Sequence, residues 1–380
     1  MTSIFVLKRR AILIAASVLM AACGSELGEP QQVALGPTGP SPSGPVTLST
    51  PTPVSPTEGE QLQTLRPTLV VENSTSTVPS GSRTYEFQVS DRSDFSLGAT
   101  LGGSFLVAVN QTGVAEGGGR TSFTLPADLQ PTTRMYWRAR AVQGSSSSQW
   151  SSPVMFKTKL MGYNRPGELY DPLINGETIG TPVRVSFVQG KGVRLDTETS
   201  YVRYELEQTI SSGEFSAEVE GLQAGEPGEK LKVFSMQNGT GNLLNSPFLM
   251  NVQYRGATNA NPNNSFSFKV LYGSDARKFE PGSSDRKVAS LNGSTTYFWK
   301  ATWGTGEFRL LVQEGINGPT LYNHAEGTIG SYNPTPHFAY LGANNKEFGT
   351  PEGGSRKNAI LRHVWISDKP RPSNLGNALD

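Results

Sequence analysis

The sequence predicts an all-β protein built from two consecutive sandwiches, and three observations support this prediction. Apolar and polar residues alternate in many short runs, which is the period of a strand with one buried face. The 42 Gly and 26 Pro residues suit frequent turns. Beyond residue 22, no segment places apolar residues at helical spacing over three turns, so long helices are not expected.

The clearest strand signal is an aromatic hairpin at Gly293–Glu314. Its first run places these residues on one face: Tyr297, Trp299, Ala301 and Trp303. Gly304-Thr305-Gly306 follows as a turn, and Glu307–Gln313 alternates in the same way. Because a hairpin is not stable alone in water, we expect the surrounding C-terminal half to supply the rest of a sheet.

Residues 1–22 have the pattern of an export signal. A basic cluster at positions 8–10 precedes an apolar stretch, Ala11–Met20, which is too short to span a bilayer as a stable helix. Cys23, the single cysteine, follows Ala21-Ala22. Met20-Ala21-Ala22-Cys23 resembles the lipobox of bacterial lipoproteins, which implies cleavage before Cys23 and acylation of its thiol and amino group. The alternative is an ordinary secretory signal with an incidental cysteine.

The address that this resemblance implies is the bacterial cell envelope. Gly24, rather than Asp, follows Cys23, which resembles the pattern for release to the outer membrane. Several acyl chains, such as palmitate, anchor a protein far better than one. With a single thiol, no disulfide can form within the chain, so the fold depends on its core.

Charge argues against nucleic acid as the partner. The whole chain has a formal net charge of +1, and loss of the first 22 residues leaves 30 basic against 32 acidic residues, a net charge of −2. Phosphate binding requires a basic face, which this balance does not predict. Residues 23–50 are rich in Pro, Gly and Ser and are expected to form a semi-stiff tether.

Residues 51–160 carry strand signals at sandwich spacing. The expected strands are Pro67–Glu72, Thr84–Ser90, Arg120–Leu125, Met135–Val142 and Val154–Thr158. The order of Tyr85–Ser90, Leu129-Gln130-Pro131, Tyr136–Ala141 and Trp150-Ser151 resembles a fibronectin type III domain. The resemblance implies a spacer or adhesion module without chemistry of its own, in which Gly113–Arg120 is a flexible connection.

Residues 161–376 hold the longest series of strand signals. Besides the hairpin, the expected strands are Tyr201–Gln208, Glu214–Leu222, Lys230–Gln237, Phe248–Tyr254, Ser265–Tyr272, Pro336–Gly342 and Ala359–Ser367. The series Phe215–Val219, Tyr297–Trp303, Arg309–Val312, Phe338–Gly342 and Ile360–Asp368 resembles a laminin-G-like or concanavalin A-like jelly roll. That fold hosts both lectins and enzymes, so it does not decide the function.

The leading functional prediction is a lectin-like, non-catalytic module that binds extracellular polysaccharide or glycan. Sugar binding uses an exposed aromatic face for the pyranose ring and amides or carboxylates for the hydroxyls. The candidate ligand-binding residues are Trp303, Tyr322, Tyr332 and Asn323. A structural or adhesion role in the envelope, without a small ligand, is a further alternative.

A polysaccharide-degrading enzyme on the same fold is the other alternative. Glu218 and Glu220 share one strand face, and neighbouring carboxylates of this kind serve retaining glycosidases. Tyr322 and His324 share a face if that segment is extended, and such a pair can abstract and donate protons in a lyase. Neither pair has the surrounding pattern of a known enzyme family.

No metal site is predicted from spacing. No His-x-x-x-His or cysteine cluster suggests zinc. The jelly-roll resemblance makes calcium an option, because loops at 258–264 and 274–287 carry oxygen donors, but their spacing is not that of a calcium loop. We therefore expect no cofactor, with calcium as the alternative.

Overall fold

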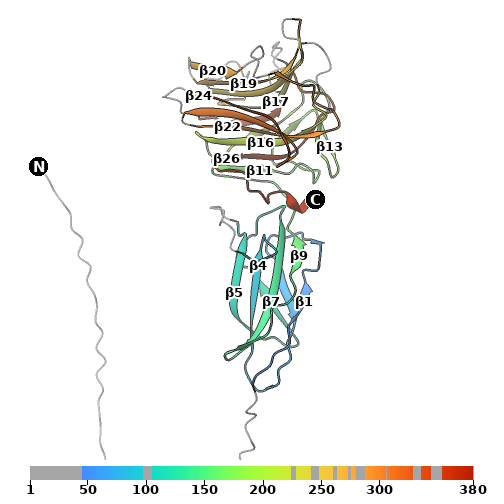
Figure 1. The fold of residues 1–380 in the computed structure, drawn as a ribbon, viewed down its shortest axis with the longest axis vertical. Coiled ribbons are helices and arrows are strands. Elements are labelled where there is room, and N and C mark those ends of the chain that lie inside the picture. The colour runs from blue at the N-terminus through green and yellow to red at the C-terminus, as the bar shows by residue number, and fades with distance from the viewer. Residues whose placement is uncertain are drawn as a thin grey trace, which may run out of the picture. The chain divides into compact units, whose positions relative to one another are not determined.

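The structure is a computed structural model that describes residues 45–96, 105–223, 228–240, 248–259, 263–272, 275–279, 287–304, 306–327, 335–343 and 353–379. Residues 46–380 form one compact unit. The predicted signal, Cys23 and nearly all of the predicted tether lie outside the described residues. Strands dominate the described part, which also contains a short 3-10 helix, η4 (Asn377–Leu379). The all-β prediction is confirmed (Figure 1). None of the described helices has the length and hydropathy needed to cross a membrane.

Nine strands precede residue 160 and form two sheets. They are β1 (Thr52–Ser55), β2 (Glu60–Gln61), β3 (Thr68–Glu72), β4 (Thr84–Ser90), β5 (Ala108–Ala115), β6 (Arg120–Thr124), β7 (Arg134–Gln143), β8 (Ser146–Ser147) and β9 (Val154–Lys157). A three-stranded sheet has the order β1-β3-β6, and a six-stranded sheet has the order β2-β9-β7-β4-β5 with β8 on β7. Alternate residues of both sheets form one hydrophobic cluster, which includes Tyr85, Phe87 and Trp137.

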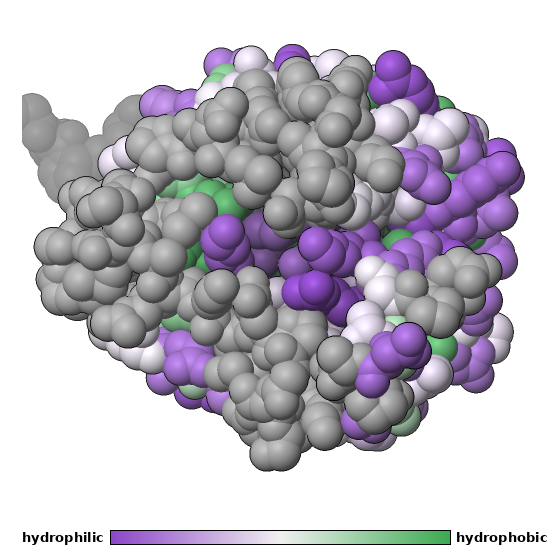
Figure 2. All heavy atoms as spheres, turned by 90° about the horizontal axis from the view of Figure 1, so that it is seen from above, coloured by the Kyte–Doolittle hydropathy of each residue, from purple (hydrophilic) through white to green (hydrophobic). Residues whose placement is uncertain are grey.

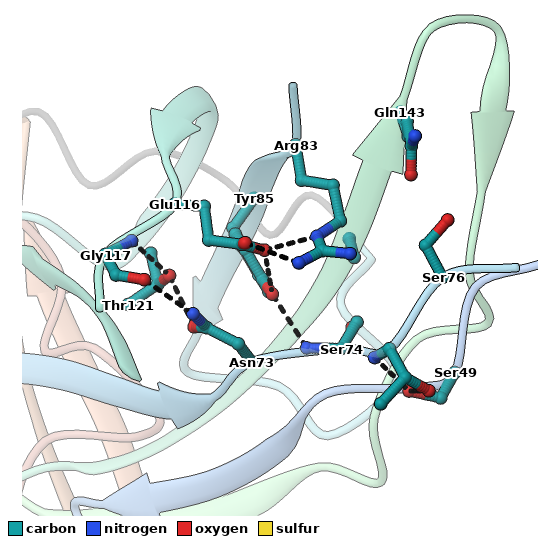
Figure 3. A network of polar contacts seen from close by, with 12 residues as sticks. Ser49, Asn73, Ser74, Ser76, Arg83, Tyr85, Glu116, Gly117, Thr121 and Gln143 are labelled. Carbon is teal, nitrogen blue, oxygen red and sulfur yellow. Dashed lines mark hydrogen bonds and ion pairs between the residues drawn. The ribbon is translucent and has the colours of Figure 1, made fainter. Parts of the chain in front are cut away.

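A hydrogen-bonded network beside β4 stabilises this first part (Figure 3). Glu116 accepts hydrogen bonds from Arg83 Nε at 2.5 Å and Nη2 at 2.6 Å, and a third from the Tyr85 hydroxyl at 3.0 Å. The same hydroxyl accepts the Ser74 amide at 2.7 Å. The Arg83 contact lowers the pKa of Glu116, so this carboxylate stays charged and keeps the buried phenol of Tyr85 partnered.

The second part contains seventeen strands among the described residues. They are β10 (Tyr163–Arg165), β11 (Glu168–Asp171), β12 (Thr181–Val183), β13 (Val185–Val188), β14 (Gly192–Leu195), β15 (Tyr201–Glu205), β16 (Gly213–Glu220), β17 (Lys230–Gln237), β18 (Phe248–Arg255), β19 (Asn264–Tyr272), β20 (Asp275–Phe279), β21 (Lys287–Val288), β22 (Thr296–Trp303), β23 (Glu307–Glu314), β24 (Thr320–Gly327), β25 (Phe338–Gly342) and β26 (Ile360–Ser367).

These strands make two large sheets. A nine-stranded sheet has the order β10-β11-β26-β16-β22-β23-β24, with β13 and β14 joined to β26. An eight-stranded sheet has the order β12-β15-β25-β17-β18-β19-β20, with β21 on β19. Figure 1 shows β22, β16, β26 and β11 side by side. One hydrophobic cluster draws residues from both sheets, so the two sheets form a sandwich.

The hairpin of β22 and β23 has the predicted faces. Tyr297, Trp299, Ala301 and Trp303 all lie in the core cluster, as do Phe308, Leu310 and Val312 of β23. The register pairs Trp303 with Phe308 and Tyr297 with Glu314. The aromatic alternation therefore identified one of the central elements of the sandwich.

The structure also corrects parts of the strand prediction. The segment predicted as the flexible connection Gly113–Arg120 is partly strand, because β5 runs to Ala115 along β4 and β6 begins at Arg120, which leaves residues 116–119 as the connection. The short strands β10–β14 were not predicted. Each has three or four residues, too few for an alternation to stand out in a sequence.

Candidate functional site

The outer face of the eight-stranded sheet is the candidate site. Strands alternate their side chains, so the inward residues of β18, such as Met250, Val252 and Tyr254, enter the core cluster. The residues between them, Asn251 and Gln253, point to the opposite face. Polar side chains also occupy the corresponding outer positions of β17, β19 and β25. Most of these side chains are buried, which is unusual for polar residues.

Five of these residues form a row across five neighbouring strands, called the polar row below. They are Arg203 (β15), Tyr340 (β25), Ser235 (β17), Asn251 (β18) and Lys269 (β19). Each lies directly opposite the next in the antiparallel register. Directly paired positions bring side chains to one face within about 5 Å of each other, so this row is a continuous polar strip.

The centre of the polar row is buried and incompletely hydrogen-bonded. Tyr340 is 1% exposed, Ser235 is 1% exposed and Asn251 is 3% exposed. Among the described residues, no hydrogen-bond donor reaches the buried Oδ1 of Asn251. The same holds for Oε1 of Gln253, two residues further along β18. A buried polar atom without a partner costs about 1–3 kcal/mol. These oxygens are therefore positions where a ligand or a water would gain a hydrogen bond.

Neighbouring amides extend the polar row on both sides. Gln237 donates a hydrogen bond from Nε2 to the Tyr340 hydroxyl at 3.3 Å. Gln253 donates from Nε2 to Ser267 Oγ, also at 3.3 Å. These contacts fix the orientation of two amides and one phenol. The polar row and its neighbours therefore carry both hydrogen-bond donors and acceptors, the groups that bind a polyhydroxylated ligand.

The two ends of the polar row are positively charged. Arg203 and Lys269 are both half-buried. Neither forms an ion pair within the part of the chain that the structure describes. Uncompensated cations flanking a neutral polar centre favour a ligand that carries negative charge.

The described surface offers little support for an apolar partner. On the face seen in Figure 2, the described residues are mainly hydrophilic, and hydrophobic residues lie in small separate areas. Among the described residues, the exposed large hydrophobic side chains are Ile179 and Leu321. Such scattered residues are normal on a folded surface and do not make a docking patch.

The structure corrects the prediction of Trp303 as a ligand-stacking residue. The side chain is 3% exposed, belongs to the core cluster and donates its indole N–H to the Ile210 carbonyl at 3.2 Å. Its position at the end of β22, before the Gly304 turn, leaves it on the inward face. Trp303 is therefore a packing residue.

Tyr322 is likewise buried, at 6% exposure, with its ring 4.6 Å from that of Phe266 in an edge-on contact. Its strand, β24, is extended, and the register pairs Tyr322 with Val312 and His324 with Leu310, so the two residues share the inward face. His324 lies 2.9 Å from Glu326 through Nε2. The predicted pair is thus on one face, but Tyr322 is packed against an aromatic ring.

Asn323 points to the opposite face from Tyr322 and is exposed. Its Oδ1 accepts a hydrogen bond from Arg309 Nη1 at 2.8 Å. Asn323 and Tyr322 therefore do not form one binding site, which corrects their grouping. Tyr332 lies outside the described residues.

Glu218 and Glu220 share the outer face of β16, as predicted, but both carboxylates are engaged. Arg362 Nε lies 2.7 Å from Glu218 Oε2, and Arg362 Nη1 lies 3.5 Å from Glu220 Oε2. Lys191 Nζ is 3.8 Å from the second carboxylate oxygen of Glu220. A nucleophile and an acid need carboxylates in contrasting environments, whereas one guanidinium, that of Arg362, contacts both of these.

No metal centre appears among the described residues, since no three His, Cys, Asp or Glu side chains come close enough to hold an ion. The loops considered for calcium fall partly outside the described ranges.

The polar row was missed by sequence reasoning because its members come from five separate strands. The outer positions could be read within each predicted strand, but their alignment depends on the strand order β15-β25-β17-β18-β19. A β-bulge between Lys232 and Phe234 also breaks the alternation of β17. The available signal was the set of polar residues in Lys230–Gln237 and Phe248–Arg255, which alternate with core residues.

Comparison with known proteins gives resemblance of fold only. No known protein family matches the sequence, and no curated protein is similar to it. Lectin II from Ulex europaeus is 9% identical with a TM-score of 0.34, over 53% of this chain and 97% of the lectin. The exoplasmic/lumenal domain of VIP36, bound to Ca²⁺ and Man3GlcNAc, is 12% identical with a TM-score of 0.32, over 50% of this chain and 85% of that domain.

Enzymes also appear among the similar structures. The enzymatically active domain of bacteriophage CBA120 tailspike protein 2 is 14% identical with a TM-score of 0.34, and the match covers 55% of this chain but 31% of the tailspike chain. The alginate lyase from Klebsiella pneumoniae is 10% identical with a TM-score of 0.29, over 52% of this chain and 78% of the lyase. These TM-scores are too low to transfer a ligand or a reaction to this chain.

Proposed function

We propose that the protein is an envelope lipoprotein that binds an extracellular polysaccharide on the outer face of its eight-stranded sheet. The observation that carries the proposal is the polar row with its buried, incompletely hydrogen-bonded centre. Sugars present many hydroxyls, and each can donate to an oxygen such as Asn251 Oδ1 or accept from a hydroxyl such as that of Ser235. The strip across five strands suits an extended chain better than a compact ligand.

The cations at the two ends of the polar row favour an anionic polysaccharide as the ligand. Arg203 can form a bidentate contact with a carboxylate or sulfate, whereas Lys269 acts as a point charge. Polar groups in the centre would fix the register of the sugar units, and the cations would raise the encounter rate and the selectivity for charged chains. We expect neutral glucans to bind more weakly than acidic polysaccharides.

The test is a polysaccharide panel with the full chain purified in detergent. The panel contains acidic polymers (alginate, polygalacturonate) and neutral polymers (laminarin, xylan). We expect binding to at least one acidic polymer, binding about tenfold weaker in Asn251→Ala, and no change in Asn323→Ala, which alters the exposed amide on the other sheet. Equal binding by wild type and Asn251→Ala, or no binding to any polymer, contradicts the proposal.

The lipid anchor is a separate part of the proposal. It is supported by the sequence Met20-Ala21-Ala22-Cys23 after an apolar stretch. Labelling with a palmitate analogue in a bacterial host should mark the wild-type chain and not a Cys23→Ser variant. Export of an unlabelled wild-type chain would support an ordinary secretory signal instead.

A second candidate is cleavage of an acidic polysaccharide at the same row, which the contact between Gln237 and the Tyr340 hydroxyl favours. In this reaction the Tyr340 phenolate oxygen would take the proton at C5 of a uronate whose carboxylate is neutralised by Arg203. The glycosidic C4–O bond would then break, and the Tyr340 hydroxyl would return the proton to the leaving oxygen. Elimination would produce an unsaturated uronate that absorbs ultraviolet light. Its appearance with wild type and absence with Tyr340→Phe would select the enzymatic function; binding without product would select the lectin-like function.

A further inference from the structure

A separate pocket lies on the outer face of the nine-stranded sheet, the other side of the sandwich. Its volume is about 610 Å³, within the range of small-molecule sites. Residues of β16 and β26 line one part of it, and residues of the C-terminal segment 371–379 line another. Stacked sheets lie about 10 Å apart, so this pocket is distinct from the polar row.

Arg371 is the most informative residue of the pocket. Its guanidinium donates from Nη1 to the His363 carbonyl and from Nη2 to the Leu375 carbonyl, both at 3.0 Å. It also lies over the Tyr170 ring, 5.7 Å from the centroid. Among the described residues, no carboxylate forms an ion pair with it. Glu214 and Glu218 act on its charge at longer range. Three cationic side chains, Lys191, Arg362 and Arg371, and two carboxylates line the pocket, so its net positive charge favours an anionic ligand.

A β-bulge in β26 creates this arrangement. The register of β16 and β26 shifts between Ser216 and Glu218, opposite the segment Arg362–Trp365. His363 takes a left-handed backbone conformation there, with φ of 55°. Its Nδ1 lies 3.1 Å from the Tyr170 hydroxyl, and its carbonyl accepts the Arg371 bond. Strain of this kind persists where neighbouring contacts fix it, and it is common at binding sites.

Other residues that line the pocket carry acceptors. Glu218 and Glu220 line it together with Arg362, which holds both carboxylates in place. Each carboxylate oxygen has more than one acceptor position, so contact with Arg362 leaves capacity for a ligand hydroxyl. Ile174, Ile316 and Leu375 contribute apolar surface. The pocket thus combines one anion position, several hydroxyl acceptors and an apolar wall.

We propose that this pocket binds a monosaccharide-sized polyol bearing one carboxylate, a uronic acid or a chemically equivalent hydroxy acid, with the carboxylate on Arg371 and the hydroxyls facing Glu218 and Glu220. The site is independent of the polar row and of the polysaccharide proposed there. It gives the domain two recognition sites on opposite sheets.

Isothermal titration of the full chain tests this proposal with four probes: sodium glucuronate, sodium galacturonate, glucose and sodium sulfate. We expect one of the two uronates to bind and glucose to bind at least tenfold more weakly. Binding of sulfate as tightly as the uronates would reduce the pocket to an anion site and contradict the polyol assignment. No uronate binding, or equal binding of glucose, would overturn the proposal.

Two variants locate the binding. Arg371→Ala should abolish it, and Ile316→Trp should block the pocket from its half-buried apolar wall without removing a charge or a hydrogen bond. Arg309→Ala, which removes an exposed cation that lines neither the pocket nor the polar row, is the matched control and should bind the uronate as wild type does. If Ile316→Trp is folded by circular dichroism and binds normally, the ligand is elsewhere. Loss of uronate binding in Arg203→Ala instead would assign it to the polar row.

Discussion

Tyr340 and Ser235 lie directly opposite each other on β25 and β17, on the face of the eight-stranded sheet that points away from the core. Both side chains are buried, although each carries a hydroxyl. Outer positions of a sheet that were merely structural would be apolar if buried, or exposed if polar. The pairing of two buried hydroxyls on this face is one reason for proposing that it binds a ligand.

The charged ends of the polar row should control selectivity and salt dependence. We expect Arg203→Ala and Lys269→Ala each to weaken binding of an acidic polysaccharide about three- to tenfold, because each removes a cation that forms no ion pair among the described residues. Binding titrations at low and high ionic strength should show a smaller salt effect in both variants. A salt dependence equal to that of wild type would mean that these cations do not face the ligand.

Trp303→Ala should affect stability and leave ligand contacts intact. Removing a buried Trp leaves a cavity, and the Ile210 carbonyl loses the indole N–H that donates to it. We therefore expect the free energy of unfolding to fall by about 3–5 kcal/mol. Denaturant unfolding measures this directly. Near-wild-type stability combined with lost polysaccharide binding would instead make Trp303 a ligand-binding residue.

Arg362 should act as a structural clamp on Glu218 and Glu220. Arg362→Ala leaves Glu218, whose side chain is 12% exposed, without its charged partner, and we expect a loss of about 1–3 kcal/mol. The matched control is Arg309→Ala, because Arg309 and Glu307 are 40% and 52% exposed and such a pair contributes about 0–1 kcal/mol. Equal effects in chemical denaturation would show that the Arg362 cluster has no special role.

Two buried groups should give opposing pH dependences of stability. Burial, with smaller contributions from Arg371 and Arg362, lowers the pKa of His363 from 6.5 to about 3. The unfolded chain therefore binds a proton that the folded chain does not, and stability falls as pH drops from about 6.5 to about 3. Burial raises the pKa of Asp171 from 3.8 to about 6, so its contribution rises as pH drops from about 6 to about 4.

These two effects largely cancel between about pH 4 and 6, each at about 1.4 kcal/mol per pH unit. Asp171→Asn should leave the His363 effect alone and make stability fall more steeply toward acid. His363→Asn, which tolerates the left-handed backbone, should change the slope in the opposite direction. Thermal unfolding of both variants across this range checks the signs, and parallel curves would refute the assignment.

The core could be predicted from the sequence where one strand carries its own pattern. Tyr297–Trp303 and Phe308–Val312 alternate strictly, and their inward faces follow from that period alone. The same reasoning could not show whether Trp303 is a core residue or an exposed aromatic that stacks on a ligand. Burial of a side chain at a strand end depends on which other segment packs over it. In this structure the Ile210 segment supplies that cover.

The candidate sites needed tertiary information. Asn251 and Tyr340 are 89 positions apart in the chain, and only the strand order brings them to either side of Ser235. Arg371 follows the last strand, where the sequence shows no motif, and the bulge at His363 that orients it is a local break in alternation. Sequence patterns predict faces within a strand, whereas binding surfaces depend on the register between strands.

The most direct test of the central claim is the affinity of the full chain for an acidic polysaccharide with and without the Asn251 amide. A hydrogen bond at this buried position is worth about 1.4 kcal/mol, or tenfold in the dissociation constant. We predict that Asn251→Ala keeps the wild-type fold and binds about tenfold more weakly, while Asn323→Ala binds normally. Wild-type affinity in a folded Asn251→Ala chain would contradict the account.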